Sequence, residues 1–252
     1  MEKANQINDE KVKEHFNKVA SYHGNDNAVL DSSLNNKSRH DNIYHHYSTL
    51  RSVKLNIEKD KNKVILDFGC GTGRFFSFMS KSFKKLIATD ASEEMLKISI
   101  ERAKNYNNVE VIPYEDFFNK DIHVDVVYTF WVLAHCSDTQ IKIIFKKLYK
   151  ILNNKGNLYI FEQISKNGRY LSDVHYQRSI DDYIQLAKEF GFVFEKTKNL
   201  IRYPSYARSI WKKLPSWCRF LMPVLYYVEK KTVNRKPEFI DYHTSLILFR
   251  KE

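Results

Sequence analysis

The sequence contains little cysteine and no long apolar run. Its three cysteines are an odd number at wide spacing, with no C-x-x-C pair and no accompanying metal ligands: Cys70, Cys136 and Cys218. We therefore expect reduced thiols and no bound metal. No stretch approaches the ~20 apolar residues of a membrane span, and the polar residues 1–6 lack the apolar core of a signal peptide. These absences predict a cytoplasmic protein that is neither secreted nor transmembrane.

Acidic residues are almost missing from one stretch of the chain. Residues 196–236 contain eleven lysines and arginines but one acid, Glu229, so this segment carries +10 of the formal net charge of +11. The remainder of the chain is close to neutral. That distribution argues against a protein whose whole surface binds nucleic acid.

Short apolar runs alternate with segments of helical period from residue 64 onward. Seven runs are candidate strands: 64–66, 86–89, 109–112, 124–128, 158–161, 192–194 and 244–249. Helices are expected between them, around residues 75–81, 93–105, 140–152 and 179–190. This alternation is typical of a doubly wound α/β fold. The long insertion before the last run favours a mostly parallel seven-stranded sheet with an antiparallel edge strand.

The length suits one large α/β domain, or one domain that carries an additional lid. Residues 1–60 precede the first strand and contain two helical patterns, so we expect an N-terminal helical cap over the carboxyl edge of the sheet. Residues 61–252 are expected to form the α/β domain, with the basic and aromatic residues 196–236 as an insertion.

A glycine-rich turn follows the first strand, in the order Asp67-Phe68-Gly69-Cys70-Gly71-Thr72-Gly73. Such a turn brings the backbone close to a ligand, and phosphate is the first candidate. The third glycine, however, comes only two residues after the second, unlike a dinucleotide site, and no Gly-Lys-Ser/Thr of a P-loop follows. An acid two residues before the first glycine favours a cationic ligand. The amine and sulfonium of S-adenosylmethionine supply such charges.

Acids also stand at the ends of the next two strands. Asp90 follows the second strand about 20 residues after the glycines, where an acid can accept hydrogen bonds from ribose hydroxyls. The third strand runs into Glu115 and Asp116, either of which could bind an adenine amino group. Three acids at three consecutive strand ends form one pattern.

These segments resemble the successive motifs of class I S-adenosylmethionine-dependent methyltransferases. The resemblance rests on residues 64–73, 89–96 and 125–128, and extends from about residue 64 to residue 161. It implies a Rossmann-like methyltransferase fold of the small-molecule type, with S-adenosyl-L-methionine as cofactor. Carried over residue by residue, it implies a set of cofactor-binding residues: Asp67, Gly69, Gly71, Gly73, Asp90, Met95, and Glu115 or Asp116.

The segment after the fourth strand, residues 129–136, is expected to border both cofactor and acceptor. Phe130 is expected at the cofactor and Trp131 at the substrate, each as a wall residue. His135 is the candidate catalytic base; the alternative is a histidine that is hydrogen-bonded inside the next turn. Tyr22 ends a helix resembling those that close over the cofactor in small-molecule methyltransferases. No Asp/Asn-Pro-Pro-Tyr/Phe follows the strand, which weakens the case for nucleobase amines.

Aromatic residues are interleaved with the bases of residues 196–236. This composition allows a single-stranded RNA groove, an anionic membrane surface, a lid for an anionic small molecule, or a solvated charged face. Bulky aliphatic residues favour the lid and the membrane over RNA. The expected substrate-binding residues are Trp131 together with Tyr44, Arg202, Tyr203 and Tyr206.

The sequence thus predicts methyl transfer, with oxygen favoured, to a small-molecule, sugar or lipid-linked acceptor that bears an anionic group. The alternatives are an RNA (tRNA) methyltransferase and a catalytically silent partner protein that binds S-adenosylmethionine. Peripheral contact with the inner membrane surface is compatible with the basic insertion. The oligomeric state is left open by the sequence.

Overall fold

The computed structural model describes residues 7–26, 28 and 39–252. Part of the expected N-terminal cap, including the polar stretch between its two helices, lies outside the described residues. Within them, no helix is long and apolar enough to cross a membrane.

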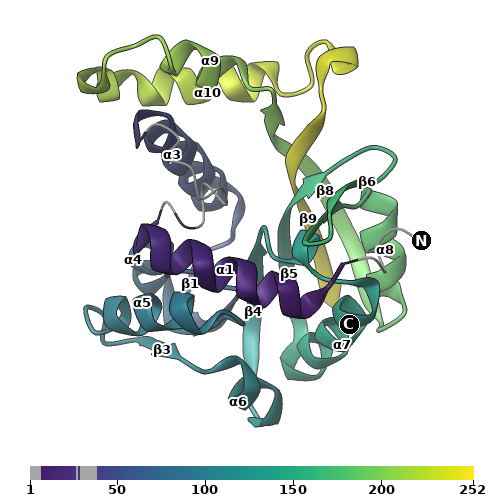
Figure 1. The fold of residues 1–252 in the computed structure, drawn as a ribbon. Helices are drawn as coiled ribbons and strands as arrows, with labels where there is room; N and C mark the ends of the chain where they lie inside the picture. Colours follow the sequence, from purple (N-terminus) through teal and green to yellow (C-terminus); the bar gives the residue numbers. More distant parts are fainter. Residues whose placement is uncertain (1–6, 27, 29–38) are drawn as a thin grey trace.

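A seven-stranded sheet forms the centre of the molecule, in the order β3-β2-β1-β4-β5-β9-β8 (Figure 1). Its strands are β1 (Asp60–Phe68), β2 (Phe83–Thr89), β3 (Val109–Val111), β4 (Val124–Phe130), β5 (Leu152–Ile164), β8 (Phe192–Tyr203) and β9 (Tyr242–Lys251). All seven predicted strands and the mostly parallel sheet are confirmed.

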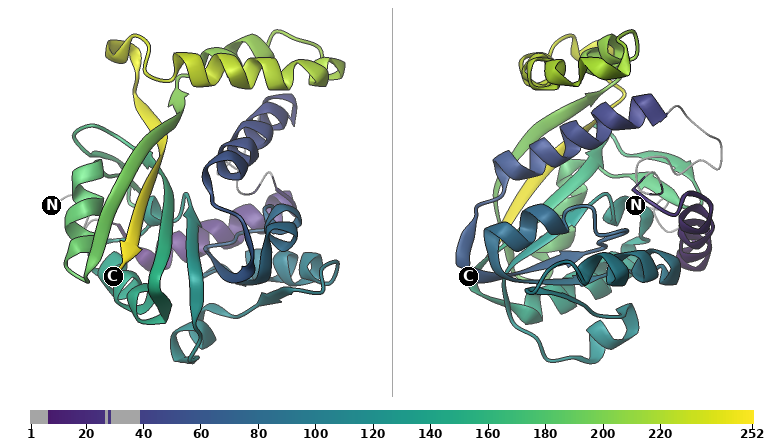
Figure 2. Two further views of the ribbon diagram at one scale, coloured as in Figure 1. Left: turned by 180° about the vertical axis from the view of Figure 1, so that it is seen from behind. Right: turned by 90° about the vertical axis from the view of Figure 1, so that its left-hand side faces the viewer.

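The antiparallel strand is not at the edge, where the sequence placed it. β9 pairs antiparallel with both β5 and β8, so it lies inside the sheet, and the edge strand is β8. After β8 the chain passes through the insertion. It then returns in the opposite direction as β9, between β5 and β8 (Figure 2).

Helices cover both faces of the sheet. One face carries α3 (Arg39–Asn56), α4 (Phe76–Ser82) and α5 (Glu93–Ala103), and the other carries α6 (Tyr114–Asn119), α7 (Asp138–Ile151) and α8 (Ile180–Lys188). α7 illustrates the pattern: its buried residues recur every three or four positions, at Ile141, Ile144, Phe145, Leu148 and Ile151. The hydroxyl of Ser137 caps its first turn by accepting from the amide of Gln140.

Two further units lie at the carboxyl ends of the strands. Helix α1 (Asp9–His23) runs across this edge of the sheet (Figure 1). Between β8 and β9 the chain forms α9 (Tyr206–Trp211), the 3₁₀ turn η3 (Ser216–Leu221), α10 (Met222–Thr232) and the 3₁₀ turn η4 (Pro237–Phe239). β8 runs as far as Tyr203, so residues 196–203 of the expected insertion are strand.

The insertion packs on α3 through a small apolar core of its own. Tyr44 of α3 contacts Trp211 of α9, and Met222 and Leu225 of α10 belong to the same cluster. The Arg208 guanidinium donates to both carboxylate oxygens of Asp41, each at 2.8 Å. The insertion therefore lies on α3, beyond the carboxyl end of β8 (Figure 2).

A short hairpin that no sequence pattern predicted follows β5. Its strands, β6 (Arg169–Ser172) and β7 (His175–Gln177), pair with each other outside the main sheet. The hairpin places His175 against His135, with 4.7 Å between ring centroids.

Candidate functional site

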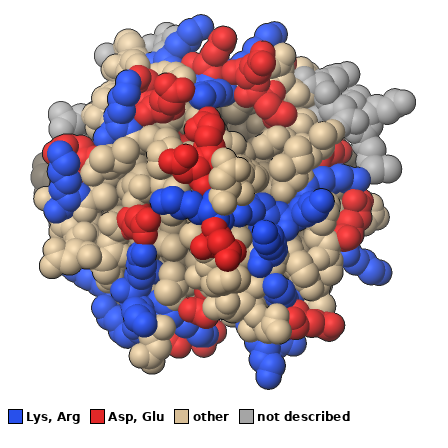
Figure 3. Space-filling model, turned by 90° about the horizontal axis from the view of Figure 1, so that it is seen from below, with Lys and Arg blue, Asp and Glu red and all other residues tan. Residues whose placement is uncertain are grey.

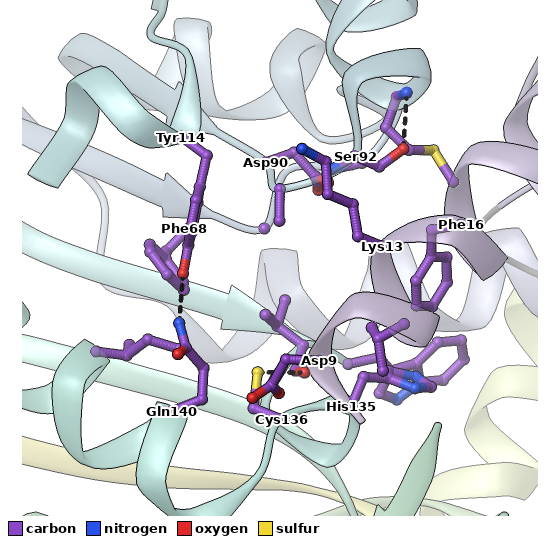
Figure 4. A pocket seen from close by; sticks show the side chains of 18 of the residues that line it. Asp9, Lys13, Phe16, Phe68, Asp90, Ser92, Tyr114, His135, Cys136 and Gln140 are labelled. Carbon is purple, nitrogen blue, oxygen red and sulfur yellow. Dashed lines mark hydrogen bonds between the residues drawn. The ribbon is translucent and has the colours of Figure 1, made fainter. Parts of the chain in front are cut away.

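A cavity of about 330 Å³ lies between α1 and the carboxyl ends of β1, β2 and β4 (Figure 4). α1 provides its roof, and the glycine turn, the end of β2, the start of α6, the segment after β4 and the start of α7 provide its walls. The lining residues are Asp9, Glu10, Val12, Lys13, Phe16, Phe68, Gly69, Gly71, Asp90, Ala91, Ser92, Met95, Tyr114, Glu115, Phe130, Trp131, Val132, His135, Cys136, Gln140 and Ile144.

The glycine turn holds the backbone close to its neighbours. Gly69 has a φ of 77°, and a Cβ at this position would lie 2.2 Å from Cγ2 of Val132, itself a cavity residue. Gly73 has a φ of 72°, and its Cβ would lie 2.6 Å from the ring of Phe76. Gly69 thus borders the cavity directly. Gly73 does not line it, and its contact indicates a role in packing α4 under the turn.

Asp90 lines the cavity and is held by backbone amides. Its Oδ2 accepts from the amide of Gly71 at 2.7 Å, and its Oδ1 accepts from the amide of Ser92 at 2.9 Å. Burial raises the pKa of Asp90, whereas these amide donors oppose that rise. A carboxylate has about four acceptor positions, so the side chain retains capacity for ribose hydroxyls.

Asp67 lies behind the glycine turn, fully buried rather than at the cavity wall. Its Oδ2 has no hydrogen-bond partner among the residues that the structure describes. Burial, followed by the nearby charge of Asp90, raises the pKa of Asp67 to about 8. A buried carboxyl oxygen without a partner beside this turn fits a cationic ligand group. The residues present therefore fit the amine or sulfonium of S-adenosylmethionine.

Helix α1 is fastened to both rims of the cavity. Lys13 Nζ lies 2.9 Å from Glu93 and 3.8 Å from Glu115. At the other end, the carboxylate of Asp9 accepts from the hydroxyl of Ser137 at 3.0 Å. Phe16, about one turn after Lys13, also lines the cavity, with its ring 5.0 Å from that of His135 (Figure 4). The helix is thus a roof that can keep water from a bound ligand.

Two buried charges fix the segment that follows β4. The Glu162 carboxylate accepts from the amides of Val132 and Leu133, at 2.6 and 2.7 Å. Burial raises the pKa of Glu162 to about 7. Arg178 donates to the carbonyls of Leu133 and Cys136 and to the carboxylate of Asp138. These bonds hold the wall residues of the cavity in place.

Trp131 adopts a backbone conformation that is unusual for a side-chain-bearing residue. Its φ is 57°, in the left-handed region, and its indole nitrogen donates to Thr244 Oγ1 at 3.2 Å. Conformations of this kind cost about 1–3 kcal/mol and are concentrated at functional sites. Trp131 and Phe130 form the cavity wall that is nearest to α3 and β8.

His135 lines the cavity as a neutral imidazole. Its Nδ1 lies 2.7 Å from the carbonyl oxygen of Val174, which requires Nδ1 to donate and leaves Nε2 without a proton. Burial lowers the pKa of His135 to about 4, although the bond to Val174 opposes this shift. His135 lines the cavity, and its imidazole hydrogen-bonds the hairpin β6–β7 instead of the turn in which His135 lies.

The cavity brings together about half of the expected site residues. Gly69, Gly71, Asp90, Met95, Glu115, Phe130, Trp131 and His135 line it. Asp116 does not line it, although the adjacent Glu115 does. Tyr22 is 52% exposed at the end of α1 and is also outside the lining.

The four other residues expected to bind substrate lie outside the cavity. Tyr44 packs beneath α9, and Tyr206 lies under the Arg202 guanidinium, 4.3 Å from ring centroid to Cζ. Arg202 donates to the carbonyls of Pro204, Arg235 and Phe239, so its guanidinium braces the insertion and does not support the expected contact with substrate. Tyr203 hydrogen-bonds His45 Nε2 at 3.1 Å.

Several cavity residues carried no signal in the sequence analysis. Asp9 and Lys13 come from α1, more than fifty residues before the first motif. Gln140 donates to the hydroxyl of Tyr114 at 2.8 Å across the wall between α6 and α7. The helical period of residues 10–22 predicted a helix, but not which of its faces covers the site.

Comparisons with known proteins agree with this geometry. A family model described as a methyltransferase domain matches residues 65–156. Phosphoethanolamine N-methyltransferase 3 of Arabidopsis thaliana is 27% identical over 136 residues, 50% of this chain and 27% of that protein. Carboxy-S-adenosyl-L-methionine synthase of Helicobacter pylori (strain HPAG1) is 29% identical over 129 residues, 50% of this chain and 53% of that protein. The chain thus spans about half, or less, of the length of these relatives.

A solved S-adenosylmethionine-dependent methyltransferase from Leishmania major has the same fold. It superposes with a TM-score of 0.66, at 13% identity, over 96% of this chain and 82% of that chain.

Proposed function

We propose that this chain, which carries a class I S-adenosylmethionine-dependent methyltransferase domain, transfers a methyl group from S-adenosylmethionine to an oxygen of a small acceptor that bears an anionic group. The observation that carries the activity is the cavity itself. The glycine turn and the amide-held Asp90 line it under a helical roof, and Asp67, whose buried Oδ2 has no partner among the described residues, lies behind the turn.

Each part of the cavity has a role in holding the cofactor. Asp67 would pair with the cationic methionyl end, Asp90 would accept from the ribose, and Glu115 would lie near the adenine. Bound S-adenosylmethionine supplies an electrophilic methyl group on a sulfonium. α1, Phe130 and Trp131 exclude water and align the reacting groups, which accounts for much of the catalysis of an in-line displacement.

The low pKa of His135 bears on the nature of the nucleophile. A base is needed only when the acceptor atom carries a proton at rest, and a histidine with a pKa of about 4 is a weak base at neutral pH. Its bare Nε2 can still accept a hydrogen bond and orient an acceptor. This favours an oxygen that is already ionised or acidic, such as a carboxylate.

Relatives support an anionic acceptor. The name of the Arabidopsis relative includes phosphoethanolamine, which contains a phosphate. That relative is an N-methyltransferase, so the choice of oxygen here rests on the neutral His135 and requires its own test.

The test is a transfer assay with S-adenosylmethionine labelled in the methyl group. Small carboxylates, phosphorylated sugars, lipid-linked glycans and tRNA serve as candidate acceptors. We expect base-labile label, as in a methyl ester, on an anionic small molecule. Acid- and base-stable N-methyl products would overturn the oxygen assignment, and label in tRNA alone would favour the RNA alternative.

The outer face of the insertion supports contact with an anionic lipid surface. Trp217, Phe220, Val224 and Tyr227 recur every three or four residues along η3 and α10 and are 58–73% exposed; we call them the apolar stripe. Exposed bases flank it: Lys212, Lys213, Arg219, Lys230 and Lys231. Apolar side chains combined with lysines suit a membrane interface. On the opposite face, by contrast, acids and bases are interspersed (Figure 3).

Vesicle sedimentation tests this contact. The double variant Trp217→Ser/Phe220→Ser should lower binding to vesicles containing phosphatidylglycerol by about tenfold. Tyr170→Ser/Leu171→Ser removes two exposed apolar side chains from the hairpin β6–β7 and serves as the matched control. Equal losses in both variants, or none in either, would exclude the apolar stripe as a lipid contact.

A further inference from the structure

A second group of polar side chains adjoins the cavity wall from the side of α3. Arg74 follows the glycine turn and does not line the cavity. Its Cζ nevertheless lies 4.9 Å from the ring centroid of Phe130 and 5.7 Å from that of Trp131, the two wall residues. His45 of α3 approaches the same wall, with its ring 5.1 Å from that of Trp131. A basic cluster therefore borders the cavity at these two rings.

The Arg74 guanidinium is buried with an unused donor. Arg74 is 7% exposed, and its Nη1 donates to Thr49 Oγ1 at 3.1 Å. Its Nη2 has no hydrogen-bond partner in the described part of the chain. Arg178 and Arg208 each form an ion pair with an aspartate, whereas Arg74 forms none with any carboxylate of the described residues.

Two other buried arginines indicate what a purely structural arginine does in this protein. Arg178 and Arg202 are each 1% exposed, and every guanidinium nitrogen of both donates to a carbonyl or a carboxylate. Complete pairing is expected, because an unpaired buried polar group is costly. Arg74 departs from this pattern beside the cavity wall.

The neighbours of Arg74 on α3 also have unused polar atoms. His45 is 6% exposed, and its Nε2 hydrogen-bonds the hydroxyl of Tyr203. Nδ1 of His45 and Nδ1 of His46, the next residue, are buried without a partner within residues 7–26, 28 and 39–252. One guanidinium and two imidazoles thus leave buried nitrogens unpaired on adjoining elements. We call Arg74, His45, His46 and Tyr203 the Arg74 cluster.

We propose that Arg74, with His45 beside it, binds an anionic oxygen group of the methyl acceptor and positions that acceptor against the Phe130–Trp131 wall. This inference rests on the proposed function and names the residues that would recognise the acceptor. Carboxylate and phosphate share the required chemistry, because the oxygens of both accept hydrogen bonds from a guanidinium. The guanidinium can donate two parallel N–H bonds to either group. An oxyanion here would use the free Nη2 and neutralise a buried charge that has no partner.

The experiment measures binding of two probe anions, benzoate and phenyl phosphate, to the full chain saturated with S-adenosylhomocysteine. We expect at least one to bind with a dissociation constant in the millimolar range or below, and Arg74→Met to weaken it at least tenfold. Arg74→Lys should retain part of the affinity, because it keeps the charge but loses the planar pair of donors. Exposed Arg169→Met is the control for lost net charge and should leave probe binding unchanged.

Binding of S-adenosylhomocysteine itself provides the check on folding. Arg74→Met should change the dissociation constant for S-adenosylhomocysteine by less than threefold. If that variant is unfolded, His45→Phe carries the test, since it keeps a ring against Trp131 and removes both nitrogens. Failure of the wild-type protein to bind either anion, or equal affinity in Arg74→Met and wild type, overturns the proposal. Anion binding that depends on Arg74 in a protein that binds no S-adenosylhomocysteine would sink the proposed function and leave this site standing.

Discussion

The cavity beneath α1 and the Arg74 cluster beneath α3 share one aromatic wall but differ in charge. Carboxylates dominate the cavity, with Asp9, Glu10, Asp90 and Glu115 at its surface and Asp67 behind it, and Lys13 is paired with Glu93. The Arg74 cluster contains an unpaired guanidinium and two histidines. The cavity suits a cationic methyl donor, and the Arg74 cluster would hold the anionic group of an acceptor whose reacting atom reaches into the cavity.

The two regions are also assembled differently. The cavity is built mainly from consecutive strand ends, so its residues follow one another along the chain. The Arg74 cluster joins α3, the residue after the glycine turn and β8, with Tyr203 lying 158 residues from His45. Apart from the residues of α1, the first region lies within residues 65–156, which match a methyltransferase-domain model. In the Arg74 cluster only Arg74 lies within those residues.

The largest effect should come from the backbone of the cavity. Gly69→Ala combines a φ of 77° with a Cβ 2.2 Å from Val132, and should lower affinity for S-adenosylhomocysteine about a hundredfold. Gly24→Ala has a similar φ of 62° but meets nothing within 4 Å. Gly24→Ala should lower the free energy of unfolding by about 1 kcal/mol and change the affinity for S-adenosylhomocysteine by less than threefold. Similar binding in the two variants would mean that the turn does not approach the ligand.

The next effect distinguishes the acids of the cavity from exposed acids. Asp90→Ala should weaken S-adenosylmethionine binding by about 1.5–3 kcal/mol, the value of a hydrogen bond to a charged group. Titration calorimetry measures the change, with Asp121→Ala on the surface as the control. Unchanged affinity would show that the ribose lies elsewhere.

The charge of Asp67 gives a pH dependence of known sign. With a pKa of about 8, Asp67 is protonated in the free protein at neutral pH, and a cationic ligand favours its ionised form. Binding should therefore release a proton, and affinity should rise by up to about tenfold per pH unit between about pH 6 and 7.5. Calorimetry in buffers of different ionisation enthalpy measures this proton. Asp67→Asn should abolish the slope; a slope that persists in this variant would assign the proton to another group.

The smallest expected change in affinity distinguishes the neighbouring acids Glu115 and Asp116. Glu115 lines the cavity and Asp116 does not. Glu115→Gln should therefore lower affinity for S-adenosylmethionine by about 0.5–1 kcal/mol, since the side chain is largely exposed, and Asp116→Asn should leave it unchanged. The reverse order would place the adenine on the other side of α6.

The contrast between the regions also explains what could be predicted from the sequence. Gly69, Asp90 and Glu115 were recognisable because each follows an apolar strand, and parallel strands bring their ends together. Arg74 and Arg202 differ in a way that no local pattern encodes. Arg202 binds carbonyls that are distant in sequence, while Arg74 is left with a free nitrogen. The roof formed by α1 and the internal position of β9 likewise depend on tertiary contacts.

The central claim is that the cavity beneath α1 binds S-adenosylmethionine. Titration calorimetry of the purified chain with S-adenosylmethionine, S-adenosylhomocysteine and NAD tests it most directly. We expect the two sulfur nucleosides to bind with micromolar dissociation constants and NAD to give no heat of binding. If neither sulfur nucleoside binds, or if NAD competes with them equally, the glycine turn serves another ligand and the account is contradicted.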